Sequence, residues 1–201
     1  METNKRKPIA IPVLIVLLAV SFTMNVLLYT KNIQHGRDQL EQTGGEIIQT
    51  AEMSKNLVEQ LLQFIDVIQD ESTSETAGKR ATAHAAAVYM ASHDALLRLQ
   101  QFAEETPLEE MRVTNATNNM AEFQKNSMEL LTTIGEGKGS LADEEQAKLA
   151  QLKQTLQQIN EQWTDFPFQY AGYYTSLIRL ANGQEWLPIA ANIDAAVAGD
   201  K

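Results

Sequence analysis

The pattern of hydrophobic and polar positions begins with a long apolar run. From Pro8 to Thr30 there are 23 residues without a single Asp, Glu, Lys, Arg or His. An α-helix of this length extends about 34 Å, and the hydrocarbon core of a lipid bilayer is about 30 Å thick. The pattern therefore predicts that residues 8–30 form a transmembrane helix embedded in a membrane.

The residues that flank this run indicate its orientation in the membrane and whether it is cleaved. A basic n-region followed by small residues, such as Ala19 and Ser21, also suits a secretory signal peptide. The apolar run continues past them to Tyr29, which favours an uncleaved signal-anchor. Positively charged flanks stay in the cytoplasm, so residues 1–7 are expected to form a cytoplasmic tail and the rest to lie outside the cell membrane. The residues that set this orientation are Lys5, Arg6 and Lys7.

Four later segments show apolar or small residues at steps of three or four, which is the period of a helix with one buried face. Similar lengths and short connections are typical of an antiparallel helical bundle. We therefore predict an all-α fold, a four-helix-type bundle over residues 46–166. The stripes are Ile47, Ala51, Ser54, Val58, Leu61, Ile65 and Ile68; Ala81, Ala85, Val88, Ser92, Ala95, Leu99 and Phe102; Val113, Ala116, Met120, Phe123, Ser127, Leu130 and Ile134; and Ala142, Glu145, Leu149, Leu152, Leu156, Ile159, Trp163 and Phe166.

The boundaries of these segments carry helix-capping signals. The capping-box pattern occurs at Ser72-Thr73-Ser74-Glu75 and again at Thr106-Pro107-Leu108-Glu109. The second predicts a tight corner, with a kinked continuous helix as the alternative. The glycines of 135–139 are expected to end the third helix and Ser140 to cap the fourth. Between anchor and bundle, residues 31–45 contain Gly36, Gly44 and Gly45 and are interpreted as a juxtamembrane hinge.

The C-terminal part, residues 167–201, is interpreted as an aromatic-rich helical extension. Seven of the 13 aromatic residues lie in the 24 residues from Trp163 to Trp186. Tyr and Trp dominate the binding energy of protein interfaces, so this cluster is the candidate interaction surface. The alternative is that the segment folds back and plugs one end of the bundle. The candidate residues are Trp163, Phe168, Tyr170, Tyr173, Tyr174 and Trp186.

Charge and composition exclude several classes of function. Residues 31–201 contain 13 Lys and Arg against 25 Asp and Glu, which disfavours nucleic acid as a partner. The sequence has no cysteine. The glycines of GEGKGS lack the spacing of a phosphate-binding loop, and no nucleophile-elbow pattern occurs. We therefore expect no enzyme activity, no catalytic or metal-binding residues and no cofactor.

The layout, one anchor followed by helical segments, resembles the sensory modules of bacterial chemoreceptors and histidine kinases. It also resembles the N-terminal half of the spore germination protein YpeB. We expect an interaction module that binds or regulates another envelope protein. The alternative is a small-molecule-binding sensor with a ligand groove between helices, next to the amide-rich stretch 114–119. Apolar stripes of this kind pack against each other within one molecule or between two copies, so self-association is also an option.

Overall fold

The computed structural model describes residues 10–70, 76–106 and 113–199. It divides into two compact units, residues 1–40 and residues 41–201. The described residues are helical or lie in turns, and no strand occurs among them. This confirms the predicted all-α class. The basic tail with Lys5, Arg6 and Lys7 lies outside the described residues, as do the predicted cap at 72–75 and residues 107–109 of the second capping motif. Thr106, the predicted cap residue of that motif, ends the preceding helix as its C-cap, and its hydroxyl donates a hydrogen bond of 2.9 Å to the carbonyl of Phe102.

Helix α1 (Ala10–Gln69) supplies all of the described structure in the first unit. Among the residues with described placement, it is the one helix long and apolar enough to cross a membrane. Its apolar window has a mean hydropathy of 2.2, and none of that window is buried. Residues 31–45, including their three glycines, are helical.

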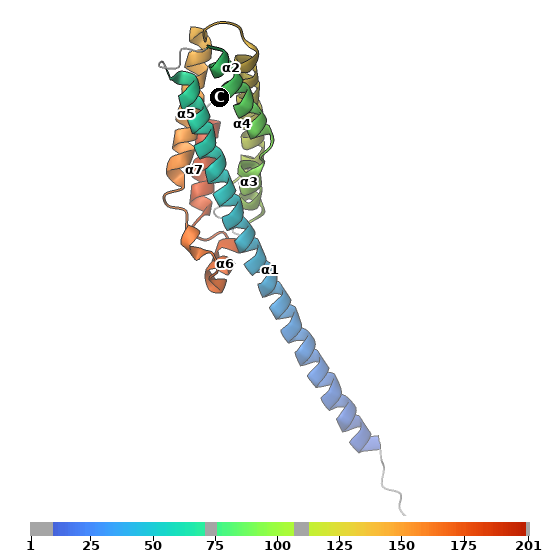
Figure 1. Cartoon of the computed structure of the whole chain (residues 1–201). Helices are drawn as coiled ribbons and strands as arrows, with labels where there is room; N and C mark the ends of the chain where they lie inside the picture. The colour runs from blue at the N-terminus through green and yellow to red at the C-terminus, as the bar shows by residue number, and fades with distance from the viewer. Residues whose placement is uncertain (1–9, 71–75, 107–112, 200–201) are drawn as a thin grey trace, which may run out of the picture. The chain divides into compact units, whose positions relative to one another are not determined.

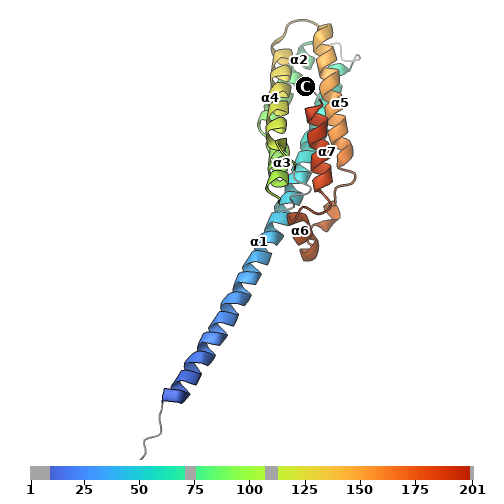
Figure 2. The same cartoon turned by 180° about the vertical axis from the view of Figure 1, so that it is seen from behind.

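The second unit is built from the later part of α1 and the helices that follow it. Helix α4 (Ala116–Glu136) contacts the most neighbours, and it packs against helices from both sides of it in the sequence. Figures 1 and 2 show these helices side by side along α4. The others are α2 (Thr76–Ala91), α3 (Ala95–Glu105), α5 (Asp143–Gln162), the 3-10 helix η2 (Phe168–Tyr170), α6 (Tyr174–Ala181) and α7 (Leu187–Ala198).

Three of the four predicted stripes form the core. Every residue of the first stripe, Ile47 to Ile68, is buried. The third stripe is buried except for the partly exposed Leu130, and the fourth is buried from Leu149 onward. Polar residues separate the apolar positions clearly in these helices, so their sequences identify the inward face.

The first part of the second stripe was assigned to the wrong face, whereas its later members Ala95 and Leu99 are buried as predicted. Ala81, Ala85 and Val88 are exposed, whereas Ala83, Ala87 and Met90 are buried. The segment is also two helices, because α2 ends at Ala91 and α3 begins at Ala95. Seven alanines among the fifteen residues 81–95 give little contrast between faces, so helical period alone does not determine which side packs inward.

Helix α7 belongs to the same core as the preceding helices. It packs against α3, α4 and α5, and it buries Leu187, Ile189, Ile193 and Val197. The buried amide of Gln100 in α3 donates a hydrogen bond of 3.1 Å to the carbonyl of Ala190. The C-terminal residues therefore contribute to the interior along the length of α7, rather than closing one end alone.

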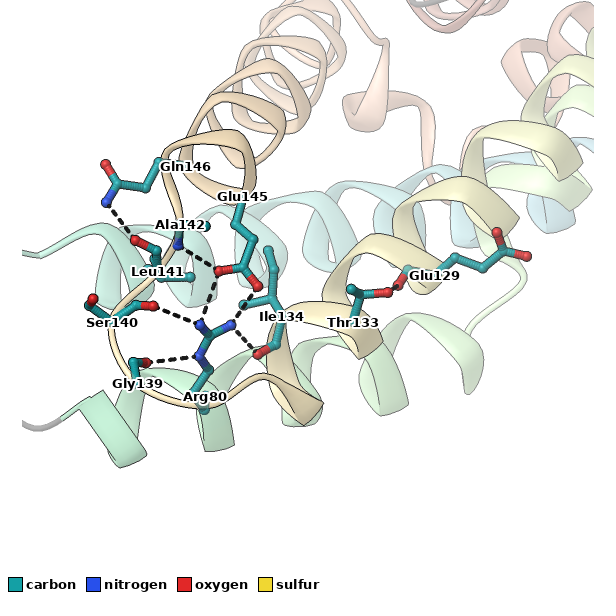
Figure 3. A network of polar contacts seen from close by, with 10 residues as sticks. All are labelled: Arg80, Glu129, Thr133, Ile134, Gly139, Ser140, Leu141, Ala142, Glu145 and Gln146. Carbon is teal, nitrogen blue, oxygen red and sulfur yellow. Dashed lines mark hydrogen bonds and ion pairs between the residues drawn. The ribbon is translucent and has the colours of Figure 1, made fainter.

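A buried arginine fixes the connection between α4 and α5. Arg80 of α2 is only 7% exposed, and its guanidinium lies against the loop that joins these two helices (Figure 3). It donates to the carbonyls of Ile134 at 2.6 Å and Ser140 at 3.0 Å, and it forms two hydrogen bonds with the Glu145 carboxylate. This cluster ties three helices together through one side chain.

The α4–α5 connection partly matches its prediction. Helix α4 ends at Glu136 with Gly137 as its C-cap, as the glycine run predicts. Ser140 does not cap the next helix, because the N-cap residue of α5 is Ala142. The Glu145 carboxylate accepts a hydrogen bond of 2.8 Å from the backbone N–H of Ala142, and the Ser140 carbonyl is bound by Arg80. The capping role thus falls to Glu145.

Candidate interaction surface

The aromatic segment begins where α5 ends at Gln162. Two turns follow, in which the backbone N–H of Trp163 bonds to Asn160 at 3.3 Å and that of Phe166 bonds to Trp163 at 3.3 Å. Pro167 has no N–H to continue a helix and disfavours helical geometry at the residue before it. Gly172 has a φ of +82°, a value that favours glycine, and it lies in the turn before α6. These features make the segment between α5 and α6 a short, irregular connection.

Two of the predicted surface residues are buried and do not belong to a surface. Trp163 is 3% exposed and packs edge-on against Phe166, with 6.1 Å between ring centroids. Trp186 is completely buried, and its indole N–H donates a hydrogen bond of 2.8 Å to the carbonyl of Leu180. Both tryptophans act as anchors that hold the segment onto the core, which corrects their assignment to the interaction surface.

The remaining four predicted residues are partly or fully exposed. Tyr173 is 66% exposed and Tyr174 is 41% exposed. Phe168 and Tyr170 are half-buried against the core. The Lys55 ammonium lies 5.6 Å from the centre of the Phe168 ring, within the range of a cation–π contact. We call Tyr170, Tyr173 and Tyr174 the tyrosine surface, since these three side chains carry the accessible aromatic area of the segment.

A charged pair follows the tyrosine surface in the chain. The Arg179 guanidinium pairs with the Glu185 carboxylate and donates a hydrogen bond of 3.1 Å to the side chain of Gln184. The neutral Tyr170 hydroxyl interacts with the Glu185 carboxylate, and this interaction raises the pKa of Tyr170 above its ordinary value of 10.0. Glu185 itself has a φ of +74°. The carboxylate is thus held between a phenol and a guanidinium.

The glycine at position 44 sets how closely α6 approaches α1. A Cβ atom added to Gly44 would overlap the backbone carbonyl of Leu177, which is buried in α6. At Gly45, the next residue, no atom lies within 4 Å of an added Cβ. The close approach of two helix backbones explains Gly44 within the second unit. The sequence alone did not distinguish the two glycines.

No family model, curated protein or solved structure matches this chain. A functional proposal for it therefore rests on the geometry of its own residues.

Proposed function

We propose that this chain is a membrane-anchored helical interaction module that binds or regulates another envelope protein. The observation that carries this proposal is the exposure of Tyr173 and Tyr174, at 66% and 41%. Neighbouring large side chains that are exposed together are more informative than a single exposed one, because an exposed apolar patch often marks a binding surface. Exposed tyrosines are typical of protein interfaces, because they contribute large contact area and lose little conformational entropy on binding.

The rigid setting of these tyrosines supports the same proposal. Trp163 and Trp186, at the two ends of the aromatic segment, are buried in the core. Arg179 and Glu185 are fixed in an ion pair. A surface that is ordered before binding pays less entropy when its partner docks. An acceptor carboxylate and a donor guanidinium beside the Tyr170 hydroxyl fit a partner surface that carries polar groups.

The proposed location follows from the N-terminal apolar stretch. We place residues 8–30 in the cell membrane as a signal-anchor, with the tail that contains Lys5, Arg6 and Lys7 in the cytoplasm and the helical domain outside. Residues 31–45 would then connect membrane and domain. The unburied apolar window of α1 supports the membrane assignment, and the excess of positive charge before it supports the orientation.

The proposed architecture is an antiparallel, four-helix-type bundle with α6 and α7 as its extension. The shared hydrophobic core supports it, since buried residues from Ile47 in α1 to Val197 in α7 form one cluster. Short connections also support it: α2 and α3 are separated by three residues, and α4 and α5 by six. Such a scaffold would hold the tyrosine surface in a fixed position.

Site-specific photo-crosslinking of the full-length protein in its native membrane tests the proposal. A photoreactive side chain replaces Tyr173 in one variant and Val88, which is 53% exposed on α2, in a matched control. We expect a single defined adduct from position 173 alone, which disappears when Tyr174 is also changed to alanine. An adduct with a second copy of this chain would assign the surface to self-association instead. Equal adducts from both positions, or none, would refute the proposal.

A further inference from the structure

A surface groove lies between the first half of α2 and the glycine-rich loop that follows α4. Its volume is about 580 Å³. Figure 3 shows this loop beside Arg80 of α2, where the carbonyls of Gly139 and Ser140 accept hydrogen bonds from the guanidinium. None of the residues that line the groove belongs to the aromatic segment, so the groove is distinct from the tyrosine surface.

Two glycines allow one wall of the groove to lie close to α2. A Cβ atom added to Gly135 would lie 3.0 Å from the Cβ and the backbone nitrogen of His84. A Cβ atom added to Gly137 would overlap the guanidinium of Arg80. The glycine run lacks the spacing of a phosphate-binding loop, and its role here is to shape this wall.

The α2 side of the groove is apolar and uncharged. Ala77 and Ala81 line it, and both residues are exposed. The outward face of a surface helix normally carries charged or polar residues, as α4 does with its exposed pair Lys125 and Glu129. The exposed alanines therefore provide a place where an apolar group can be covered.

Two side chains with N–H donors border this apolar floor. Lys138 lines the groove from the loop and His84 lines it from α2, and both are exposed. Neither side chain forms an ion pair or a hydrogen bond within residues 10–70, 76–106 and 113–199. The ammonium of Lys138 and one ring N–H of His84 are therefore available to a ligand.

Negative charge is absent from the described lining of the groove. No Asp or Glu lines it among the described residues, and none occurs in the sequence from Thr76 to His93. Arg80 also lines the groove, but all three of its nitrogens already donate hydrogen bonds and Glu145 balances its charge. Residues 31–201 as a whole contain 13 Lys and Arg against 25 Asp and Glu. The groove is thus a local site for an anion on an acidic domain.

We infer that the groove binds a monocarboxylate with an apolar chain, such as a fatty acid of medium length. The chain would cover Ala77 and Ala81, and the carboxylate would face the Lys138 ammonium and accept a hydrogen bond from His84. The volume of the groove lies within the roughly 300–1,000 Å³ of small-molecule sites. Inorganic phosphate would leave the apolar floor uncovered, and an apolar ammonium would meet no carboxylate. This site goes beyond the proposed protein interaction and does not depend on it.

Nuclear magnetic resonance of the full chain in micelles of a non-ionic detergent tests the inference. The chain has three histidines, His35, His84 and His93, so selective ¹³C labelling of histidine gives one ring signal for each. Octanoate is the probe. We expect it to shift the His84 signal saturably, while the signals of His35 and His93 report any general effect of octanoate on the micelle. No shift at His84, or equal shifts at all three histidines, would overturn the inference.

Three analogues test the chemistry of the ligand. Acetate keeps the carboxylate without the chain, octan-1-ol keeps the chain without the charge, and octylammonium reverses the charge. We expect none of them to match octanoate at His84. An acidic chain attracts octylammonium non-specifically, so the sign of the preferred charge separates a built site from general attraction. A response to octan-1-ol or octylammonium as strong as that to octanoate would overturn the assignment of a carboxylate.

Paired variants locate the site. Lys138→Gln should weaken octanoate binding by about threefold, as expected for an exposed ionic contact. Lys125→Gln is the matched control, because Lys125 is exposed on α4 and does not line the groove. Equal losses of affinity in the two variants would overturn the location.

A steric pair provides an independent test. Ala81→Phe should fill the groove and abolish the saturable shift of His84. Ala85→Phe is the matched control, because Ala85 is also an exposed alanine of α2 but does not line the groove. Both changes lie on the surface, and far-ultraviolet circular dichroism checks that the fold is retained. Octanoate binding that survives Ala81→Phe, or is lost equally in Ala85→Phe, would place the ligand elsewhere.

Discussion

The guanidinium of Arg80 and the carboxylate of Glu145 meet in a two-pronged contact, with hydrogen bonds of 2.7 and 3.0 Å. The two residues are 65 positions apart in the sequence and come from α2 and α5. Parallel hydrogen bonds of this type combine charge attraction with fixed geometry. The same guanidinium also contacts the end of α4, so the pair determines how three helices meet.

Arg80→Ala should therefore destabilise the protein by about 3 kcal/mol, because it leaves the Glu145 carboxylate and three backbone carbonyls without their donor. Urea unfolding of the full chain in micelles, followed by circular dichroism, measures this change. Arg98→Ala is the matched control, since Arg98 is exposed and its guanidinium lies 6.0 Å from the centre of the Phe102 ring in a cation–π arrangement. It should cost less than about 1 kcal/mol. Equal costs for the two variants would contradict the assigned role of Arg80.

The same pair predicts a dependence of stability on pH. The hydrogen bond from Arg80 lowers the pKa of Glu145 below its ordinary value of 4.5. A lowered folded-state pKa stabilises the protein above the unfolded-state pKa, and this stabilisation is lost as the pH falls through the folded-state pKa. Glu145→Gln should thus be less stable than the parent at pH 7, and the difference should shrink below pH 4.5. Glu129→Gln, an exposed change, should leave the pH profile unaltered. A constant difference at all pH values would argue against this linkage.

The two neighbouring glycines of α1 should respond to alanine with opposite signs. Gly44→Ala places a methyl group on the Leu177 carbonyl and should cost about 1–3 kcal/mol, as overpacking does. Gly45→Ala meets no atom within 4 Å and should stabilise the helix by up to about 1 kcal/mol. Chemical denaturation of both variants under identical conditions is the measurement. If both substitutions change stability in the same direction, α6 does not approach α1 at Gly44.

Substitutions of Trp186 and Tyr173 should distinguish a residue that stabilises the fold from one that only lies on its surface. Trp186→Ala removes a completely buried ring and should cost about 3–5 kcal/mol. Tyr173→Ala changes a side chain that is 66% exposed and should alter stability by less than about 0.5 kcal/mol. Thermal unfolding of both variants tests this contrast. A large loss of stability in Tyr173→Ala would show that the tyrosine surface is structural.

The helical class and most of the core could be predicted because apolar residues recur at steps of three or four, with polar residues between them, in α1, α4 and α5. The inward face of α2 could not be predicted from the sequence, since alanine is compatible with both burial and exposure. Arg80 was missed, although it shares the spacing of Ala83, Ala87 and Met90. A charged residue in phase with buried positions is a usable signal for a buried ion pair. Its partner Glu145 could not be identified, because that pairing depends on tertiary structure.

The candidate site was predicted only in part. The density of aromatic residues located the segment but did not indicate which rings face outward. Trp186 is buried and its indole N–H reaches the Leu180 carbonyl, whereas Tyr173 is the N-cap residue of α6 and is 66% exposed. Ser127 was correctly placed on the inner face of α4, where it is 4% exposed.

The contribution of α7 to the core has a consequence for biosynthesis. Ile47 and Val197 are both buried in one hydrophobic cluster, although about three quarters of the chain separates them. A ribosome makes the chain from its N-terminus at about 5–20 residues per second, so the cluster stays incomplete for several seconds after Ile47 emerges. During this interval the nascent domain exposes the apolar surface that α7 later covers.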